Sequence, residues 1–216
     1  MNDNQQFRAV MWDIDGTLLL SESMHFRALR HTVGTEGKHV PDDFHHEIVG
    51  RAARVVYQTV RDRFDLEMSF DQFRRLKYGY YTEHAHEIQV RPGALEAWRT
   101  FEAHGLRQAL VSNSDRIVVN ANIRVLGLEE PGFISVSIND VVNGKPHPEP
   151  YHRGAALLGV EPHQCIAVED SPTGARAAHA AGTRVIAWPE DLELEFPPEI
   201  PTIADIEAEV AHILKV

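Results

Sequence analysis

Cysteine is almost absent from this chain of 216 residues, which contains only Cys165. One cysteine excludes an intrachain disulfide, and its place in the apolar run 164–168 indicates a buried structural thiol. Long apolar segments are missing as well, since no run approaches the roughly 18 residues that a membrane-spanning helix needs. Residues 1–6 are polar and carry no apolar signal core. We therefore expect a cytoplasmic protein with no membrane partner.

Basic residues are also in short supply. The chain has 21 Lys and Arg residues against 32 Asp and Glu residues, which gives a net charge of −11 at pH 7. This balance disfavours a sequence-independent hold on nucleic acid or on an anionic membrane, because like charges repel. An anionic small molecule would need a place where the chain gathers positive charge locally.

The sequence does contain an alternation of short apolar runs and helical patterns. The apolar runs predict buried parallel strands at 8–12, 108–111, 133–136, 165–168 and 184–187. Helical patterns follow at 94–104, 117–126, 150–158 and 172–181, with proline near the starts and glycine just past the ends, and a last helix is predicted at 203–214. The acidic, proline-containing segment 189–198 is expected to be an exposed loop. The alternation predicts an α/β fold with a parallel sheet covered on both faces.

One interval breaks this rhythm. Between the first strand and residue 91 the chain has far more residues than the dozen or so that a crossover requires. Apolar positions recur at helical spacing in 24–33, 44–49, 55–64 and 70–84, so we expect an inserted helical subdomain. The predicted division is a core of 1–18 and 90–216 and a helical insert of 19–89, joined by two segments that could act as a hinge.

The first predicted strand ends in two carboxylates and a turn, Asp13-Ile14-Asp15-Gly16-Thr17. Carboxylates next to a buried strand must be held by a metal, by hydrogen-bond donors or by a substrate. A calcium loop is excluded, because Thr17, Leu18 and Met24 occupy its third acidic, glycine and glutamate positions. A simple turn capped by the aspartates remains an alternative.

Polar residues follow other predicted strands as well. Ligands of open parallel sheets bind outside the carboxyl ends of the strands, so these residues should meet at one edge. Glu169 and Asp170 would join Asp13 as hard oxygen ligands suited to Mg²⁺. Ser112 could hold phosphate oxygens at a helix start, and Lys145 would supply the local positive charge. Each residue alone could instead be a helix cap or a solvated charge.

Taken together, the motifs resemble those of the haloacid dehalogenase superfamily. They are Asp13-Ile14-Asp15-Gly16-Thr17-Leu18, Val111-Ser112-Asn113, Gly144-Lys145-Pro146 and Val168-Glu169-Asp170-Ser171-Pro172-Thr173-Gly174, in the order and spacing of that superfamily. The resemblance covers nearly the whole chain and implies a Rossmann-like, three-layer core. The helical insert resembles the C1-type cap, and the branch is similar to beta-phosphoglucomutase and phosphoglycolate phosphatase.

The resemblance also implies roles. Asp13 would attack phosphorus to give an aspartyl-phosphate, and Asp15 would act as acid and base while its backbone carbonyl binds the metal. Ser112 and Lys145 would hold the phosphoryl oxygens, and Asp170 with Glu169 would complete a Mg²⁺ site. Dehalogenases resemble this pattern but lack the second aspartate. Asp15 therefore favours phosphoryl transfer.

Substrate contacts are expected from Asn113 in the second motif and from the cap. His25 lies in a segment that resembles the start of the cap, although Leu20 stands where the family usually has Asp. The segment 50–54 occupies the region of the specificity loop, where Arg51 or Arg54 could reach the distal part of a substrate, with Arg54 preferred. For each of these cap residues, a structural or solvated role is an equal alternative.

The sequence therefore predicts a magnesium-dependent phosphatase of a small phosphorylated metabolite, of the sugar phosphate or phosphoglycolate class. A beta-phosphoglucomutase-like phosphomutase is the alternative, disfavoured because Asp115-Arg116 stands where family mutases carry Lys-Asn. A non-catalytic phosphate-binding regulatory module is a third possibility, and the presence of both aspartates argues against it. Neither the individual substrate nor the oligomeric state follows from the sequence.

Overall fold

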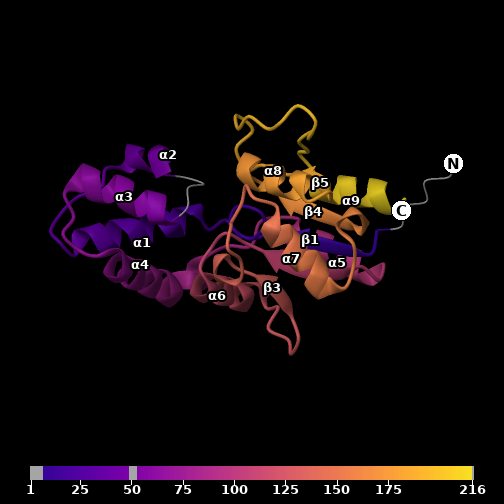
Figure 1. Ribbon diagram of the computed structural model, residues 1–216, viewed down its shortest axis with the longest axis horizontal. Helices are drawn as coiled ribbons and strands as arrows, with labels where there is room; N and C mark the ends of the chain where they lie inside the picture. The colour runs from indigo at the N-terminus through magenta and orange to yellow at the C-terminus, as the bar shows by residue number, and fades with distance from the viewer. Residues whose placement is uncertain (1–6, 49–52, 216) are drawn as a thin grey trace.

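The computed structural model describes residues 7–48 and 53–215, and its centre is a five-stranded parallel sheet (Figure 1). The strands are β1 (Ala9–Trp12), β2 (Arg107–Val111), β3 (Ile134–Val136), β4 (Cys165–Glu169) and β5 (Arg184–Ala187). Their order is β3-β2-β1-β4-β5, so β1 lies in the middle and pairs with β2 and β4. The predicted parallel sheet is confirmed.

Helices cover both faces of this sheet. They are α5 (Ala94–Ala103), α6 (Arg116–Leu126), α7 (Glu149–Leu158), α8 (Pro172–Ala180) and α9 (Ile206–Leu214), with short 3-10 turns η3 (Ile138–Asp140) and η4 (Pro162–Gln164). Val10 and Trp12 of β1 belong to the apolar cluster formed with α5, α6 and α9, whereas Met11 belongs to the cluster formed with α7 and α8. Alternate residues of one strand thus face opposite helical layers, as a three-layer α/β core requires.

In its described part, the chain between β1 and α5 forms helices α1 to α4, called the cap helices here. They are α1 (Glu22–Gly34), α2 (His45–Ile48), α3 (Ala53–Phe64) and α4 (Phe70–His84), with 3-10 turns η1 (Asp42–Phe44) and η2 (Ala85–Glu87). They extend to one side of the sheet in Figure 1. A separate apolar cluster, which includes Leu29, Val60 and Phe73, holds their outer part together. The inserted segment is therefore helical, as its apolar spacing predicts.

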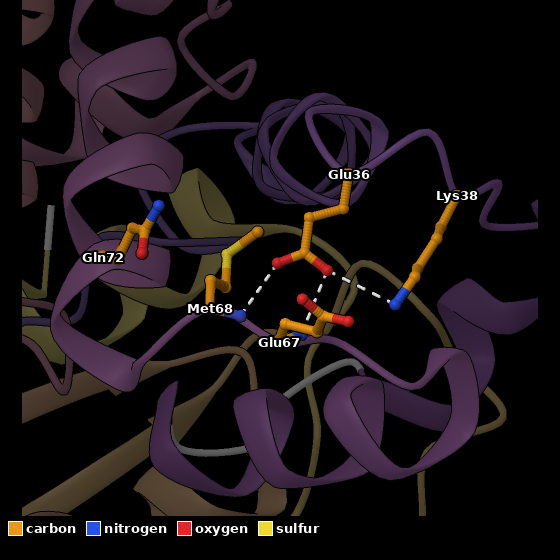
Figure 2. Close-up of a pocket in the computed structure, with 5 residues that line it drawn as sticks. All are labelled: Glu36, Lys38, Glu67, Met68 and Gln72. Atoms are coloured by element: carbon orange, nitrogen blue, oxygen red, sulfur yellow. Dashed lines mark hydrogen bonds and ion pairs between the residues drawn. The ribbon is translucent and has the colours of Figure 1, made fainter.

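Polar contacts join the residues that follow α1 to the segment before α4 (Figure 2). The Glu36 carboxylate accepts hydrogen bonds from the backbone N–H groups of Glu67 and Met68 at 3.0 and 2.8 Å, and Lys38 Nζ lies 3.3 Å from it. These residues line a pocket of about 490 Å³. The Glu36 carboxylate is already bonded to these groups. We therefore interpret the pocket as a structural feature of the cap helices and not as a binding site.

Two chain segments connect the cap helices to the core, and they pair with each other. Leu19 and Val90 form an antiparallel bridge, Leu20 N–H donates to Gln89 O at 2.9 Å, and Arg91 N–H donates to Leu18 O at 2.9 Å. We call this pairing of residues 18–20 with 89–91 the hinge ribbon. It makes the chain enter and leave the cap helices at one place.

The C-terminal part differs slightly from the expectation. Helix α9 starts at Ile206 because the Asp205 side chain caps it, accepting from Ala208 N–H at 3.0 Å, while Ile203 N–H bonds to Ala187 O at 2.8 Å. The segment after β5 is an exposed loop as predicted, with Leu192 73% exposed. Cys165 is a buried free thiol, also as predicted. Among the described residues, no helix combines the length and apolar character needed to cross a membrane.

Candidate active site

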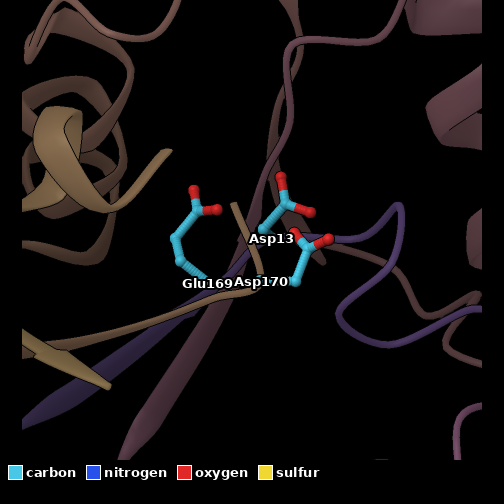
Figure 3. A group of neighbouring side chains, drawn as sticks. All are labelled: Asp13, Glu169 and Asp170. Atoms are coloured by element: carbon cyan, nitrogen blue, oxygen red, sulfur yellow. The ribbon is translucent and has the colours of Figure 1, made fainter. Parts of the chain in front are cut away.

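Three carboxylates converge where β1 and β4 end (Figure 3). Asp13 follows β1, and its backbone N–H donates to Val168 O of β4 at 3.0 Å, so the two strand ends are held in register. Asp13, Glu169 and Asp170 each offer an oxygen atom, and these atoms lie within 4.8 Å of one another. We call these residues the acidic cluster.

Lys145 is the cation of this cluster. Its Nζ donates to Asp13 Oδ1 at 2.5 Å, Glu169 Oε1 at 2.6 Å and Val111 O at 2.7 Å, and its side chain is 4% exposed. All three donor positions of the ammonium group are thereby used. Attraction to the two carboxylates outweighs burial and raises the pKa of Lys145. Lys145 therefore stays protonated.

The loop that carries Lys145 is held by Asn113. The Asn113 Oδ1 atom accepts from Lys145 N–H at 2.8 Å, and its Nδ2 donates to Lys145 O at 3.0 Å. Gly144 makes this approach possible, because a Cβ atom there would lie 2.7 Å from Asn113 Oδ1. Asn113 thus contacts the Lys145 backbone, and a contact with substrate stays a prediction.

Glu169 is wholly buried and faces away from solvent. Besides Lys145, its carboxylate accepts from the Tyr151 hydroxyl of α7 and from Ser171 Oγ at 3.4 Å. A Cβ atom on Gly174 would lie 2.0 Å from Glu169 Oε2, so the carboxylate occupies space at the start of α8 that only glycine leaves free. Negative charge is stabilised at a helix N-terminus. Glu169 consequently fixes Lys145 as well as contributing to the acidic cluster.

Crowding of carboxylates shifts the protonation of this cluster. Burial, with the nearby charges of Glu169 and Asp15, raises the pKa of Asp13 against the opposing effect of Lys145. Burial and the charges of Asp13 and Glu169 also raise the pKa of Asp170. A divalent cation would relieve this repulsion, and a set of hard oxygen donors suits Mg²⁺. The residues present therefore fit the predicted metal.

Asp15 lies close to the cluster in sequence, but its side chain has different partners. Oδ1 accepts from Ser21 Oγ at 2.7 Å and Asn122 Nδ2 at 3.2 Å, and it lies 3.1 Å from His25 Nε2. Oδ2 accepts from Ser114 Oγ at 2.7 Å. Burial acts to raise the pKa of Asp15, but interactions with His25, Ser21 and Ser114 together lower it below its usual range. Asp15 is thus held as a carboxylate between cap and core, and metal binding by its backbone carbonyl stays a prediction.

Ser112 directly follows β2, as its place after the predicted strand 108–111 implies, and it is buried. Its backbone N–H donates to Val136 O at 2.9 Å, and its Oγ accepts from Ser114 N–H at 3.0 Å. These bonds start the turn that leads into α6, at the same sheet edge as the acidic cluster. Its phosphate-holding role is compatible with this position and remains a prediction.

The predicted cap residues have different surroundings. His25 contacts Asp15, and its ring packs at a tilt against the ring of Tyr81 of α4, with the ring centroids 4.5 Å apart. Arg54 is exposed, and its guanidinium lies 4.4 Å from the centre of the Phe70 ring. Arg51 lies outside the described residues. The structure therefore brings His25 to the proposed acid, whereas Arg54 stacks on the start of α4.

Several polar residues of the site could not be found by motif. Asn122 of α6 is fully buried, and its Oδ1 accepts from the Tyr81 hydroxyl at 2.8 Å while its Nδ2 reaches Asp15. Lys77 is the notable cation, with 8% exposure on the inner face of α4. Burial lowers the pKa of Lys77, whereas Glu22, Asp15 and Asp115 act to raise it. The sequence offers one signal for Lys77: at helical spacing it falls on the same buried face of α4 as the aromatic residues 73, 78 and 81.

Comparison with known proteins defines the class to which this site belongs. The family model of haloacid dehalogenase-like hydrolases matches residues 7–182, which include the acidic cluster and Lys145. The chain belongs to this family of hydrolases. The predicted superfamily and enzyme class are confirmed.

Individual relatives are similar over most of the chain. Hexitol phosphatase A of Escherichia coli (strain K12) is 29% identical over 211 residues, covering 96% of this chain and 92% of that protein. A bifunctional riboflavin kinase/FMN phosphatase of Arabidopsis thaliana is 32% identical over 181 residues, covering 83% of this chain but only 48% of that relative. The crystal structure of CbbY from Rhodobacter sphaeroides in complex with phosphate aligns with a TM-score of 0.84 and 25% identity, covering 93% and 95% of the two chains.

Proposed function

We propose that this hydrolase is a Mg²⁺-dependent phosphatase that acts on a small phosphorylated metabolite of the sugar phosphate or phosphoglycolate class. The observation that carries the proposal is the contact of Lys145 Nζ with Asp13 inside a cluster of three carboxylates. Phosphoryl transfer requires a nucleophile, a fixed cation and metal ligands that lie close to one another. Relatives that are named as phosphatases support the same class.

In the first step, an Asp13 carboxylate oxygen forms a bond to phosphorus as the bond from phosphorus to the ester oxygen breaks. Asp15 gives its proton to the departing alkoxide, which leaves as the alcohol. In the second step, the water oxygen forms a bond to phosphorus as the bond from the Asp13 oxygen to phosphorus breaks. Asp15 takes the proton from that water, and inorganic phosphate leaves the regenerated Asp13 carboxylate. Lys145 exchanges one of its three present acceptors for a phosphoryl oxygen, and Ser112 holds another phosphoryl oxygen.

The bound metal would be held by Asp13, Asp170, Glu169 and the Asp15 carbonyl, and it would supply charge stabilisation for the phosphoryl oxygens. Asp15 must leave at least part of its present hydrogen-bond set to carry a proton. Two of its partners, Ser21 and His25, belong to the cap side, so movement of the cap would alter that set. We propose residues 19–89 as this movable cap and 1–18 with 90–216 as the core.

Substrate contacts are proposed for His25 and Lys77, with Asn113 and Arg54 as further candidates. Lys77 combines burial with a position near Asp15 and Glu22, which would favour a polar or anionic part of the substrate. A cytoplasmic location is proposed from the sequence alone.

Hydrolysis is favoured over a phosphomutase reaction by the two residues that replace the family's Lys-Asn pair. Asp115 forms an ion pair with Arg74 of α4, and Arg116 bonds to Ser135 and Asp140. Asp115 is an anion, and the cationic group of Arg116 is already held by these contacts. The pair therefore does not supply the positive charge that a second phosphate group would need.

The test is a panel of sugar phosphates, phosphoglycolate and nucleotides incubated with the protein and Mg²⁺, with inorganic phosphate as the readout. Release from one substrate class, absent in the Asp13→Asn variant, is the expected result. Conversion of glucose 1-phosphate to glucose 6-phosphate without phosphate release would instead establish the mutase reaction. No turnover of any compound would contradict an enzymatic role on these substrates.

A further inference from the structure

Arg91 is a buried arginine that the proposed mechanism does not use. It lies where the chain returns from the cap helices to α5, and it is only 8% exposed. Its backbone N–H donates to Leu18 O at 2.9 Å, directly beside the Leu19–Val90 bridge. Through its backbone, Arg91 is part of the hinge ribbon.

The guanidinium group of Arg91 joins two other segments. Nη1 donates to Gly16 O at 2.8 Å and to Trp188 O at 2.7 Å, and Nη2 donates to Pro189 O at 2.9 Å. The group also lies 3.6 Å from the centre of the Trp188 ring. A planar guanidinium can donate in several fixed directions while stacking on a ring, which an ammonium group cannot do.

Both segments held by Arg91 touch the Glu169-Asp170 end of β4. On one side, Gly16 has a left-handed φ of 83°, and a Cβ atom there would lie 2.1 Å from Asp170 Oδ2. The next residue, Thr17, donates through Oγ1 to Asp170 Oδ1 at 3.1 Å. On the other side, Trp188 N–H donates to Glu169 O at 2.6 Å. Arg91 therefore connects the two supports between which Asp170 lies.

The charge of Arg91 is not needed to neutralise a contacting carboxylate. In the part of the chain that the structure describes, its guanidinium has carbonyl oxygens as partners, while Asp170 and Glu190 act on it from further away. Burying a charge against neutral acceptors costs free energy, and an apolar side chain could fill the same space at lower cost. The directed hydrogen bonds are thus the distinctive contribution of this residue.

We propose that Arg91 is a positioning residue for the metal site, which it organises by fixing the Gly16 turn and the Trp188-Pro189 segment on either side of Asp170. Because its backbone lies in the hinge ribbon, the same residue links the position of the cap to the geometry of Asp170. The inference rests on the proposed function, since it takes the acidic cluster to be a Mg²⁺ site.

The test is Arg91→Lys, which keeps the positive charge and loses the planar fork. Mg²⁺ is titrated into the metal-free protein, and the rise in melting temperature gives the half-saturating concentration without any turnover. We expect that concentration to increase about tenfold or more, the usual effect of losing a group that orients metal ligands. At saturating Mg²⁺, kcat should recover most of its wild-type value while KM stays unchanged.

Arg27→Lys is the matched control. Arg27 also lies beside the hinge, but it is exposed and pairs with Glu87 at 2.7 Å, so its replacement should move the Mg²⁺ midpoint less than about twofold. A folded Arg91→Lys protein with the wild-type midpoint overturns the inference. Should Arg91→Lys fail to fold, Trp188→Leu removes the stacking platform, and an unchanged midpoint there overturns it equally.

Failure of the proposed function would look different. A wild-type protein that binds Mg²⁺ but hydrolyses no phosphate ester would overturn the proposed function, while the Mg²⁺ midpoints of the Arg91 variants would still decide the inference. A wild-type protein that binds no Mg²⁺ overturns both.

Discussion

Replacing Lys145 by methionine tests the centre of the proposed site, because it removes a charge while nearly keeping the volume. In the wild type, Lys145 Nζ contacts Asp13 and Glu169 at 2.5 and 2.6 Å, and both carboxylates are buried. Breaking a buried ion pair from one side costs about 3–5 kcal/mol, because the remaining charge is left uncompensated. We expect the free energy of unfolding of the metal-free protein to fall by about 3 kcal/mol at pH 8.

The loss should depend on pH in a defined direction. Without Lys145, the pKa of Asp13 rises further, so the variant keeps a proton on Asp13 at a pH where the wild type has lost it. The stability of the variant relative to the wild type should therefore decrease as pH rises above about 8, the pKa of Asp13 in the folded wild type. Urea denaturation in the presence of a chelator at pH 6.5, 8 and 9.5 measures this trend.

The same substitution should impair catalysis. Loss of one fixed donor to the transferring group costs roughly 100- to 1000-fold in rate, which corresponds to about 3–4 kcal/mol of transition-state stabilisation. Phosphate release under saturating Mg²⁺ gives kcat/KM. Lys38→Met in the cap is the control, because Lys38 contacts Glu36 and the Asp65 carbonyl, which lie outside the acidic cluster. A folded Lys145→Met protein within about tenfold of wild-type kcat/KM would refute the role assigned to Lys145.

Four further predictions concern Asp13 and Asp15. Asp13→Asn should abolish phosphate release while circular dichroism shows an intact fold, and retained turnover would exclude Asp13 as nucleophile. Asn122→Leu removes a hydrogen-bond donor to Asp15 and the acceptor of the Tyr81 hydroxyl. We expect kcat to fall about tenfold and the pKa of Asp15, read from the dependence of kcat on pH, to rise. An unchanged dependence of kcat on pH would contradict this prediction. Burial raises the pKa of Asp13 from 3.8 to about 8, so the metal-free protein should lose stability across that window as pH rises. Mg²⁺ must displace the proton on Asp13, and its stabilising effect in thermal melts should therefore grow from pH 6 to pH 8, with a pH-independent effect as the contrary result.

The sheet and the acidic cluster could be predicted because their signals are local. A buried parallel strand is a short apolar run, and the residues that follow the run lie at the carboxyl edge of the sheet. The predicted runs 8–12 and 165–168 are followed directly by Asp13 and Glu169. Strand order need not be known, because all carboxyl ends of a parallel sheet share one edge. The helical insert was equally visible as a long interval with helical spacing.

The contacts that hold Asp15 could not be predicted in the same way. Ser114, Asn122 and Tyr81 come from different elements, and their partnership depends on how α4 packs on α6. In the sequence, Asn122 is a polar residue in an amphipathic helix and Tyr81 is one of several aromatic residues. The local sequence pattern indicates on which face of a helix a residue lies. Which side chain it contacts on a neighbouring element depends on tertiary packing.

The central position of β1 affects how the protein must be made. Ala9 pairs with Arg107 on one side and with Cys165 on the other, so β1 is synthesised 98 and 156 residues before the partners of its two edges (107 − 9 and 165 − 9). At ordinary elongation rates, β1 is without its second neighbour for roughly ten to thirty seconds. During that interval β1, which is fully buried in the folded protein, exposes its apolar side chains, and exposed apolar strands favour aggregation. Slow elongation before β4 would lengthen this exposure and increase the risk of aggregation.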